Sequence, residues 1–283
     1  MIASHPKVTE ELHAVYSADG VVKIPNAVSE EWLPQIEAMA DAQLLDPGRW
    51  VTDTNPGATR DRLFTSRYRW KIDPMVNHYI YESGVGHIAA ALMGSASARF
   101  YFDHLLVKEP KTQAPTPWHQ DIPYWPFLGK QICSAWVSTS RVTVEESSLE
   151  FVRGSHSWNS YFAPEAFDGS KGWVNDFEGE PCPDVAAARE DYDIVGFDVE
   201  PGDALFFSAW ALHGSPGNAG NGRRVALSTR WLGDDATWYP HPGCDPTVTG
   251  EDTTVEIGQY PGDEDLFPLV YKTPDASLRE FNS

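Results

Sequence analysis

The sequence predicts a mainly β protein, with a β-sandwich or jelly-roll core and a few N-terminal helices packed on it. Two observations lead to this fold class. Up to about residue 95 apolar side chains recur with helical spacing, whereas from Ala98 onward short apolar runs of strand length follow one another. Turn sequences such as Pro201-Gly202-Asp203 and Pro216-Gly217-Asn218 separate these runs. Many short strands behind a few helices are typical of a two-layer β core.

The N-terminal part carries the end signals of three helices. Thr9 and Gly20 are the expected N-cap and stop of the first helix, and Ser29 is the expected cap of the second. The expected helices are, in order, 8–19, a second one closed by 46–48, and about 75–93 with a break near Gly84 and Gly86.

Strands are expected wherever short runs are rich in β-branched and aromatic residues. They are 21–25, 99–108, 131–139, 149–152, 193–199, 203–207 and 224–233. Between them, residues 157–192 form a long excursion, and such insertions usually cover a site. There is no internal repeat or clear linker. We therefore expect one domain over 1–283, with a helical part to about 95, a core over about 96–235 and a C-terminal extension over about 236–283.

Composition excludes several classes of function. The chain has 283 residues, 41 acidic against 21 basic, and a formal net charge of −20. Such a field repels nucleic acid and anionic membranes, and it disfavours a highly anionic substrate such as a CoA thioester. The three cysteines have no CxxC spacing, and no leader or membrane span is evident, so a cytoplasmic protein is expected. The expected partner is a small molecule that is neutral, zwitterionic or cationic, with no protein partner implied.

Residues 49–72 are the basic stretch of this acidic chain. Two interpretations are open: a surface loop that balances nearby acids, or a lid that helps to hold an anionic group. If residues 49–72 form a lid, the acidic and aromatic excursion 157–192 would lie on the opposite side of the cavity entrance. An entrance with opposite charges on its two sides suits a small zwitterion. The basic side chains are Arg60, Arg62, Arg67, Arg69 and Lys71.

His119-Gln120-Asp121 is the candidate metal site. On a strand, residues two apart point to the same face, so this histidine and carboxylate could hold one ion together. Of the nine histidines, His119 alone has an acidic residue two positions on. A further histidine, His213, follows an apolar strand and precedes a glycine. Two histidines and one carboxylate with open positions are typical of non-haem Fe(II) oxygenases, although a short His-x-Asp motif also occurs by chance.

Arg224 opens a strand eleven residues after His213. A planar guanidinium binds a carboxylate bidentately, so an arginine on a strand beside a metal triad indicates a dicarboxylate co-substrate. Arg224, Ser228 and Arg230 are expected on one strand face and Arg223 on the other. The alternative is that Arg223 or Arg224 makes a surface ion pair.

An ordered set of motifs resembles the phytanoyl-CoA dioxygenase family of Fe(II)/2-oxoglutarate oxygenases over about residues 8 to 235. The motifs are Pro117-Trp118-His119-Gln120-Asp121 with Tyr124-Trp125-Pro126-Phe127, Leu149-Glu150-Phe151-Val152-Arg153-Gly154-Ser155-His156, Pro201-Gly202-Asp203, and His213-Gly214-Ser215 with Arg224. The resemblance implies a double-stranded β-helix, or jelly-roll, fold. It implies Fe(II) held by His119, Asp121 and His213, and 2-oxoglutarate held at its distal carboxylate by Arg224. Trp136 matches a tryptophan that lines the co-substrate pocket, and Ser215 matches a position that helps to bind the same carboxylate.

Two departures from the family pattern fall on one turn. Arg153 stands where the family usually has proline, and Glu146-Ser147-Ser148 replaces an acidic-x-Gly sequence. Both put loop geometry in question, and His156 in this turn is expected to be structural.

The resemblance implies hydroxylation of an unactivated C–H bond of a small metabolite by O2, with release of succinate and CO2. Asp121 argues against a halogenase, in which a small residue would replace the carboxylate. Alternatives are an acyl-CoA hydroxylase, or a jelly-roll protein that keeps its metal without turnover. Four aromatic residues could line the cavity or belong to the core: Tyr124, Trp125, Trp210 and Trp231.

Overall fold

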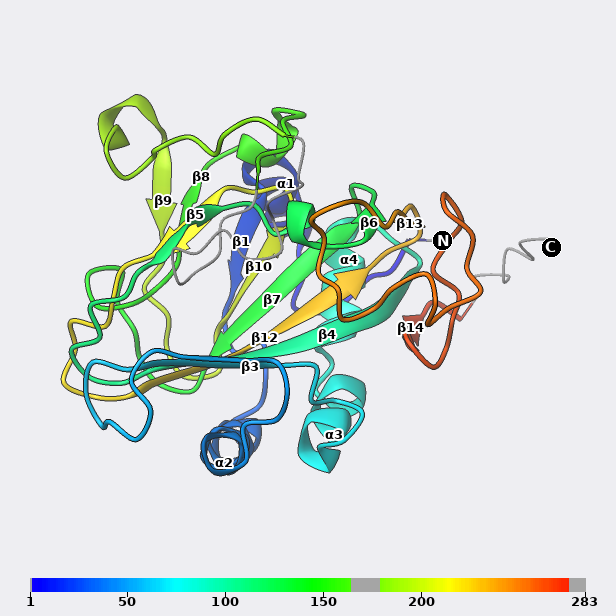
Figure 1. Cartoon of the computed structure of the whole chain (residues 1–283). Helices are drawn as coiled ribbons and strands as arrows, with labels where there is room; N and C mark the ends of the chain where they lie inside the picture. The colour runs from blue at the N-terminus through cyan, green and yellow to red at the C-terminus, as the bar shows by residue number, and fades with distance from the viewer. Residues whose placement is uncertain (1, 164–178, 275–283) are drawn as a thin grey trace.

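The computed structural model describes residues 2–163 and 179–274, and it has the predicted jelly-roll architecture. A large antiparallel sheet and a smaller one face each other, and helices cover the outer face of the large sheet (Figure 1). Among the described residues, no helix is long and apolar enough to cross a membrane.

In the described part of the chain, the large sheet has eight strands. In order across the sheet its strands are β1 (Val21–Ile24), β10 (Ala204–Ser208), β7 (Ile132–Ser138), β12 (Arg224–Leu232), β4 (Ser97–Lys108), β3 (Leu63–Arg67) and β2 (Val51–Asp53), and β14 (Leu269–Lys272) also pairs with β4. The expected strands 21–25, 99–108, 131–139, 203–207 and 224–233 are therefore confirmed. Strands from the N-terminal part and from the C-terminal extension both join this sheet.

The smaller sheet has the order β5 (Thr116–His119), β11 (His213–Ser215), β8 (Glu150–Val152) and β9 (Ile194–Gly196). The strands β13 (Thr237–Trp238) and β6 (Phe127–Leu128) make a separate pair. The expectation identified β8 and β9, placed His119 on a strand without the bounds of β5, and missed β11, because three- or four-residue strands give little periodicity to read.

The α-helices among the described residues are α1 (Glu10–Asp19), α2 (Trp32–Leu45), α3 (Pro74–Glu82) and α4 (Val85–Met93). Thr9 caps α1 through its side chain, and Gly20 ends it with φ 77°, as expected. The expected break in the third helix is also confirmed, because Gly84 takes φ 77° between α3 and α4. The cap expected from Ser29 is wrong: its hydroxyl donates to Glu31, and α2 begins without a side-chain cap.

Alternation along the central strands separates two apolar layers. Val225 and Leu227 of β12 point into the cluster formed with the helices, whereas Ala226 points toward the smaller sheet. The helix layer is packed closely: a side chain at Gly86 of α4 would lie 2.7 Å from the ring of Trp231. The face between the two sheets also carries buried polar side chains, among them Arg224, Ser228 and Arg230 of β12.

Residues 49–72 differ from the expected irregular segment, because they contain β2 and β3, which extend the large sheet beyond β4. Polar residues such as Thr65 and Ser66 are buried in β3 and obscure its strand pattern in the sequence. Arg62 pairs with Asp53 through two hydrogen bonds of 2.9 and 2.7 Å. This pairing favours the interpretation that the basic residues balance nearby acids.

Candidate active site

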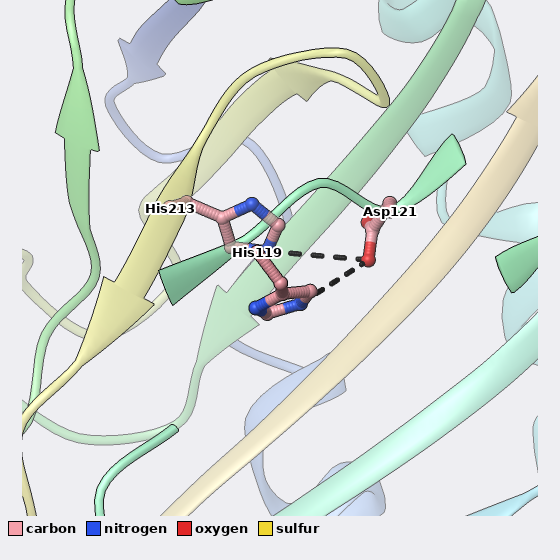
Figure 2. A group of neighbouring side chains, drawn as sticks. All are labelled: His119, Asp121 and His213. Atoms are coloured by element: carbon pink, nitrogen blue, oxygen red, sulfur yellow. Dashed lines mark ion pairs between the residues drawn. The ribbon is translucent and has the colours of Figure 1, made fainter. Parts of the chain in front are cut away.

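The two histidines of the candidate metal site lie on neighbouring strands of the smaller sheet. His119 ends β5, His213 begins β11, and the two residues are direct partners in the register of this strand pair. Their ring centroids are 4.2 Å apart (Figure 2). The β5–β11 pairing therefore brings together two histidines that are 94 positions apart in the sequence.

Asp121 reaches the same place from a turn. It lies beyond the end of β5, with helical backbone angles of φ −74° and ψ −39°, at the start of the short helix η1 (Ile122–Tyr124). The expected proximity to His119 is present, but its expected cause, alternation along one strand, is wrong. The carboxylate turns toward the histidines because the chain leaves the strand after His119.

Three ligand atoms converge at this point. Oδ1 of Asp121 lies 3.6 Å from Nε2 of His119 and 4.0 Å from Nε2 of His213 (Figure 2). All three residues are buried, and one ligand atom from each lies within 4.8 Å of the others. These separations suit donors that surround one ion at about 2.0–2.2 Å.

Backbone carbonyls fix the orientation of both rings. Nδ1 of His119 lies 2.7 Å from the carbonyl oxygen of Pro117, and Nδ1 of His213 lies 3.0 Å from that of Ala211. A carbonyl only accepts, so each Nδ1 carries the proton and each Nε2 keeps a lone pair facing Asp121. Burial and the neighbouring His119 lower the pKa of His213 to about 3, so this ligand is neutral.

The large sheet holds the second oxygen of Asp121. Oδ2 accepts a hydrogen bond of 2.7 Å from Ser134 of β7 and lies 3.4 Å from Nε of Arg230 on β12. Burial alone would raise the pKa of Asp121, but the charge of Arg230 and the neighbouring His119 and His213 hold it well below its usual range. The carboxylate is therefore ionised, and Oδ1 is the oxygen that faces the two histidines.

Arg224 lies on the same inner face at the far end of β12. It is buried, Nε donates to the hydroxyl of Ser147, and Nη1 donates to the carbonyl of Leu106. Its guanidinium carbon lies 5.6 Å from the ring of Trp136. Burial lowers the pKa of Arg224 to about 9, and no acidic residue among the described ones forms an ion pair with it.

Arg223 points the other way, as expected from strand alternation. Its guanidinium pairs with Asp41 of α2 at 2.8 Å and with Glu109 at 3.0 Å. The surface ion pair that the sequence left open is therefore made by Arg223, whereas Arg224 faces the site.

Lys108 is a residue of this pocket that the sequence did not reveal. It is the direct partner of Arg224 across β4 and β12, and its side chain is fully buried. Its Nζ donates to Ser215 Oγ at 3.2 Å and to the Pro216 carbonyl at 2.6 Å, and it too lacks an acidic partner among the described residues. Burial and the charge of Arg224 lower the pKa of Lys108 well below its usual range.

The pocket around Arg224 and Lys108 contains polar groups that could bind the carboxylate of a ligand. Trp136, which pairs with Ser228 between the two ends of β12, has a buried Nε1 with no hydrogen-bond partner in the described part of the chain. Ser215 lies beside Lys108, with Oγ 3.1 Å from the Ser147 carbonyl. Buried charges without partners are costly, so this pocket fits an anionic ligand.

The four aromatic residues suggested as cavity walls separate into two groups. The ring of Tyr124 meets that of His119 edge-on at 5.8 Å, and Trp125 lies 5.5 Å from the guanidinium of Arg230. Trp210 packs against Tyr161 at 5.8 Å on the same side of the molecule. The suggestion that Trp231 lines the cavity is wrong, because this residue is buried against the helices on the other face of the large sheet.

The described ends of the excursion 157–192 lie next to the candidate metal ligands. The side chain of Gln120, between His119 and Asp121, donates to the Ser160 carbonyl and accepts from the backbone N–H of Phe162. At the other end, the thiol of Cys182 lies 3.2 Å from the Trp118 carbonyl. Of the acidic and aromatic residues that give this segment its expected character, Glu180 is described, and the following lie outside the described residues: Glu165, Asp168, Trp173, Asp176 and Glu178.

Comparison with known proteins agrees with this geometry. The family profile described as phytanoyl-CoA dioxygenase (PhyH) matches residues 16–226, which include all the candidate ligands. The chain belongs to this family. The family is one of 2-oxoglutarate-dependent non-haem iron dioxygenases, so Fe(II), 2-oxoglutarate and O2 are its cofactor and co-substrates.

Individual relatives are distant. A probable phytanoyl-CoA dioxygenase of Caenorhabditis elegans is 29% identical over 59% of this chain, and the aligned part spans about half, 54%, of that protein. Among solved structures, the carbocyclase SnoK from nogalamycin biosynthesis is 24% identical, covers 93% of this chain and 97% of its own, and has a TM-score of 0.71. The epimerase SnoN, in a complex with Fe3+, alpha ketoglutarate and nogalamycin RO, is 24% identical, covers 93% and 98%, and has a TM-score of 0.68.

Proposed function

We propose that this protein hydroxylates an unactivated C–H bond of a small polar metabolite, with Fe(II) held by His119, Asp121 and His213 and 2-oxoglutarate held by Arg224. The observation that carries this proposal is the convergence of three oriented ligand atoms at one end of an inner sheet face. The other end of that face carries two buried cations, Arg224 and Lys108, which form no ion pair with any described residue.

The spacing along β12 supports an elongated co-substrate. Arg230, beside Asp121, and Arg224 are six positions apart on one strand face, which corresponds to about 20 Å between their Cα atoms. Both side chains are long and extend into the space between them, and Trp136 lies under that space. A five-carbon dicarboxylate fits there, with its keto-acid end toward the metal ligands and its distal carboxylate on Arg224.

The chain's own groups orient the candidate metal ligands, keep Asp121 ionised and exclude water from the site. When bound together, Fe(II) and 2-oxoglutarate would activate O2, so that one oxygen atom ends in succinate and the other in the product alcohol, with CO2 released. Ser134 and Arg230 keep Asp121 ionised and directed, and the Pro117 and Ala211 carbonyls keep both imidazoles in the metal-binding tautomer. Burial of all three ligands limits the access of water.

The alternatives have less support. A jelly-roll protein that binds metal without turnover gives no reason for two buried cations that have no acidic partner in the described part of the chain. An acyl-CoA would bring several phosphate charges toward a chain of net charge −20, whereas Arg62 and Arg69 of its basic stretch are already paired with acids.

A matched substrate panel tests the proposed substrate class. Consumption of 2-oxoglutarate by the Fe(II)-loaded protein is compared with free amino acids, betaine-like solutes and acyl-CoAs of several chain lengths. We expect a small polar metabolite to raise consumption and to gain one oxygen atom, as measured by mass spectrometry. Stimulation by acyl-CoAs alone would reject the substrate class while leaving the roles of iron and 2-oxoglutarate intact.

Replacing Lys108 by methionine tests the second cation of the pocket. Methionine keeps the apolar stem and removes the charge, so the distal carboxylate loses part of its attraction. We expect the dissociation constant for 2-oxoglutarate to rise about tenfold, the effect of losing about 1.4 kcal/mol. Calorimetric titration of the wild type and of Lys108→Met measures this, with Lys130→Met, at an exposed position, as the matched control. Equal affinities in all three proteins would remove Lys108 from the pocket.

A further inference from the structure

The C-terminal extension returns to the segment that follows the candidate metal ligand Asp121. The family profile ends at residue 226, so the described part of the extension, 236–274, lies outside the part of the chain that the profile matches. β13 of the extension pairs with β6, which begins six positions after Asp121 (Figure 1). Beyond β13, contacts of the extension with the same segment continue back toward Asp121.

Two backbone contacts show this course. The N–H of Tyr239 donates to the Pro126 carbonyl at 2.8 Å, and the N–H of Asp245 donates to the Tyr124 carbonyl at 2.6 Å. The carbonyl between these two belongs to Trp125, and it faces a side chain of the extension. Three successive carbonyl groups of the segment are therefore in contact with the extension.

His241 supplies the side chain that faces Trp125. Its Nε2 lies 3.2 Å from the Trp125 carbonyl oxygen and 2.9 Å from the hydroxyl oxygen of Tyr161, and its Nδ1 lies 3.0 Å from the Pro242 carbonyl oxygen. Tyr161 belongs to the described start of the excursion 157–192. One half-buried imidazole therefore joins the extension, the excursion and the segment that follows Asp121.

The turn that carries Asp121 has little support of its own. It contains two internal hydrogen bonds of 3.1 Å, from the Tyr124 N–H to the Asp121 carbonyl and from the Trp125 N–H to the Ile122 carbonyl. Short 3-10 helices such as η1 have poorer hydrogen-bond geometry than α-helices. The start of the turn is held by the Ile122 N–H, which donates to the Ala209 carbonyl at 2.9 Å. The end of the turn is held by the extension.

A shift of this turn would reach two of the candidate ligands. Ser134 and Arg230 hold Oδ2 of Asp121, but the backbone of this residue moves with the turn. Such a movement would change the 3.6 Å separation between Oδ1 of Asp121 and Nε2 of His119. The ring of Tyr124, which belongs to the same turn, meets the His119 ring edge-on at 5.8 Å.

From these contacts we infer that His241 is a positioning residue of the candidate iron site and fixes the turn that presents Asp121 to the metal. It acts through Trp125 rather than on the ion itself. The inference rests on the proposed function, because it concerns the geometry in which the ligands meet Fe(II). It makes the extension a part of the site, although the extension lies outside the residues that the family profile matches.

Binding of Co(II) tests the inference without turnover. The visible absorption of Co(II) depends on its coordination geometry, so the spectrum reports how the ligands are arranged. In His241→Leu we expect the absorption band to change shape and the dissociation constant for Co(II) to rise about tenfold, the lower end of the effect of losing a group that orients a metal ligand. His241→Gln is expected to restore most of the affinity, because its amide can donate to the Trp125 carbonyl.

His87→Leu is the matched control. His87 of α4 is another half-buried histidine beside a backbone carbonyl, with Nε2 2.7 Å from the Ser4 carbonyl oxygen, but it lies in the helix layer. Its replacement is expected to lower the unfolding temperature and to leave the affinity and spectrum of Co(II) unchanged. If His241→Leu does not fold, His241→Asn takes its place with the same expectation, because its side chain is too short to keep both contacts of the imidazole.

Succinate formation gives a second readout. Arg224 lies at the other end of β12, so in His241→Leu we expect kcat to fall while KM for 2-oxoglutarate changes little. A folded His241→Leu protein with the Co(II) affinity and spectrum of the wild type would overturn the inference and leave the proposed function intact. A wild type that binds no Co(II) would instead reject the iron site itself, and the inference with it.

Discussion

Alanine at His119, Asp121 or His213 is expected to abolish 2-oxoglutarate turnover. Each change removes one of three ligand atoms that lie within 4.8 Å of one another, and the remaining two cannot fix an ion in a defined geometry. Loss of a partner that only orients a metal ligand costs about 10–100-fold in metal affinity or activity, so loss of a ligand itself should cost more.

Metal content and turnover together measure this prediction. Each variant is loaded with Fe(II) under the same conditions, desalted, and assayed for bound iron and for succinate, and circular dichroism confirms that the fold is intact. His78→Ala is the matched control, because His78 lies exposed on α3, far along the chain from the triad. A folded Asp121→Ala or His213→Ala protein with wild-type iron content and activity would place the metal elsewhere.

Leucine at Arg224 is expected to weaken 2-oxoglutarate binding strongly. The distal carboxylate loses its bidentate partner in a buried pocket, and truncating one member of such a charge pair costs about 2–5 kcal/mol. The dissociation constant for 2-oxoglutarate should therefore rise by at least about tenfold. Titration of the metal-loaded protein with 2-oxoglutarate measures this directly.

Arg223→Leu is the matched control for this prediction. Arg223 is the preceding residue and carries the same side chain, but it points to the opposite face and pairs with Asp41 and Glu109. Its replacement is expected to leave 2-oxoglutarate affinity unchanged. Any cost falls on stability: the exposed pair with Asp41 contributes about 0–1 kcal/mol, and the buried Glu109 loses its partner. The opposite outcome for the two variants would mean that the face assignment of β12 is reversed.

The sequence predicts those residues of the candidate site that stand in short local motifs or follow strand alternation. His119, Asp121 and His213 stand in short motifs, and the alternation of Arg223 and Arg224 follows from strand geometry alone. The reason for the position of Asp121 was not predictable, because the end of β5 is set by its pairing with β11 rather than by residues 119–121 themselves.

Lys108 and Asp245 show why other residues near the candidate site could be identified only from the structure. Lys108 ends an apolar strand, and a lysine there is expected at the surface. Only its pairing with Arg224, 116 positions away, reveals that it is buried beside a second cation. Asp245 belongs to the C-terminal extension, whose sequence gives no sign that it returns to Arg67 and Tyr124. Contacts of this kind depend on long-range packing, which local propensity does not encode.

The most direct test of the central claim is succinate formation by the wild-type protein. The purified chain is treated with a chelator, reloaded with Fe(II) or with Zn(II), and given 2-oxoglutarate, ascorbate and O2, and succinate is quantified. Our account predicts succinate with Fe(II), none with Zn(II), and none after chelation without reloading. Succinate formed equally well by exhaustively chelated protein, or 2-oxoglutarate bound by the Fe(II) protein with no succinate formed under any condition, would contradict it.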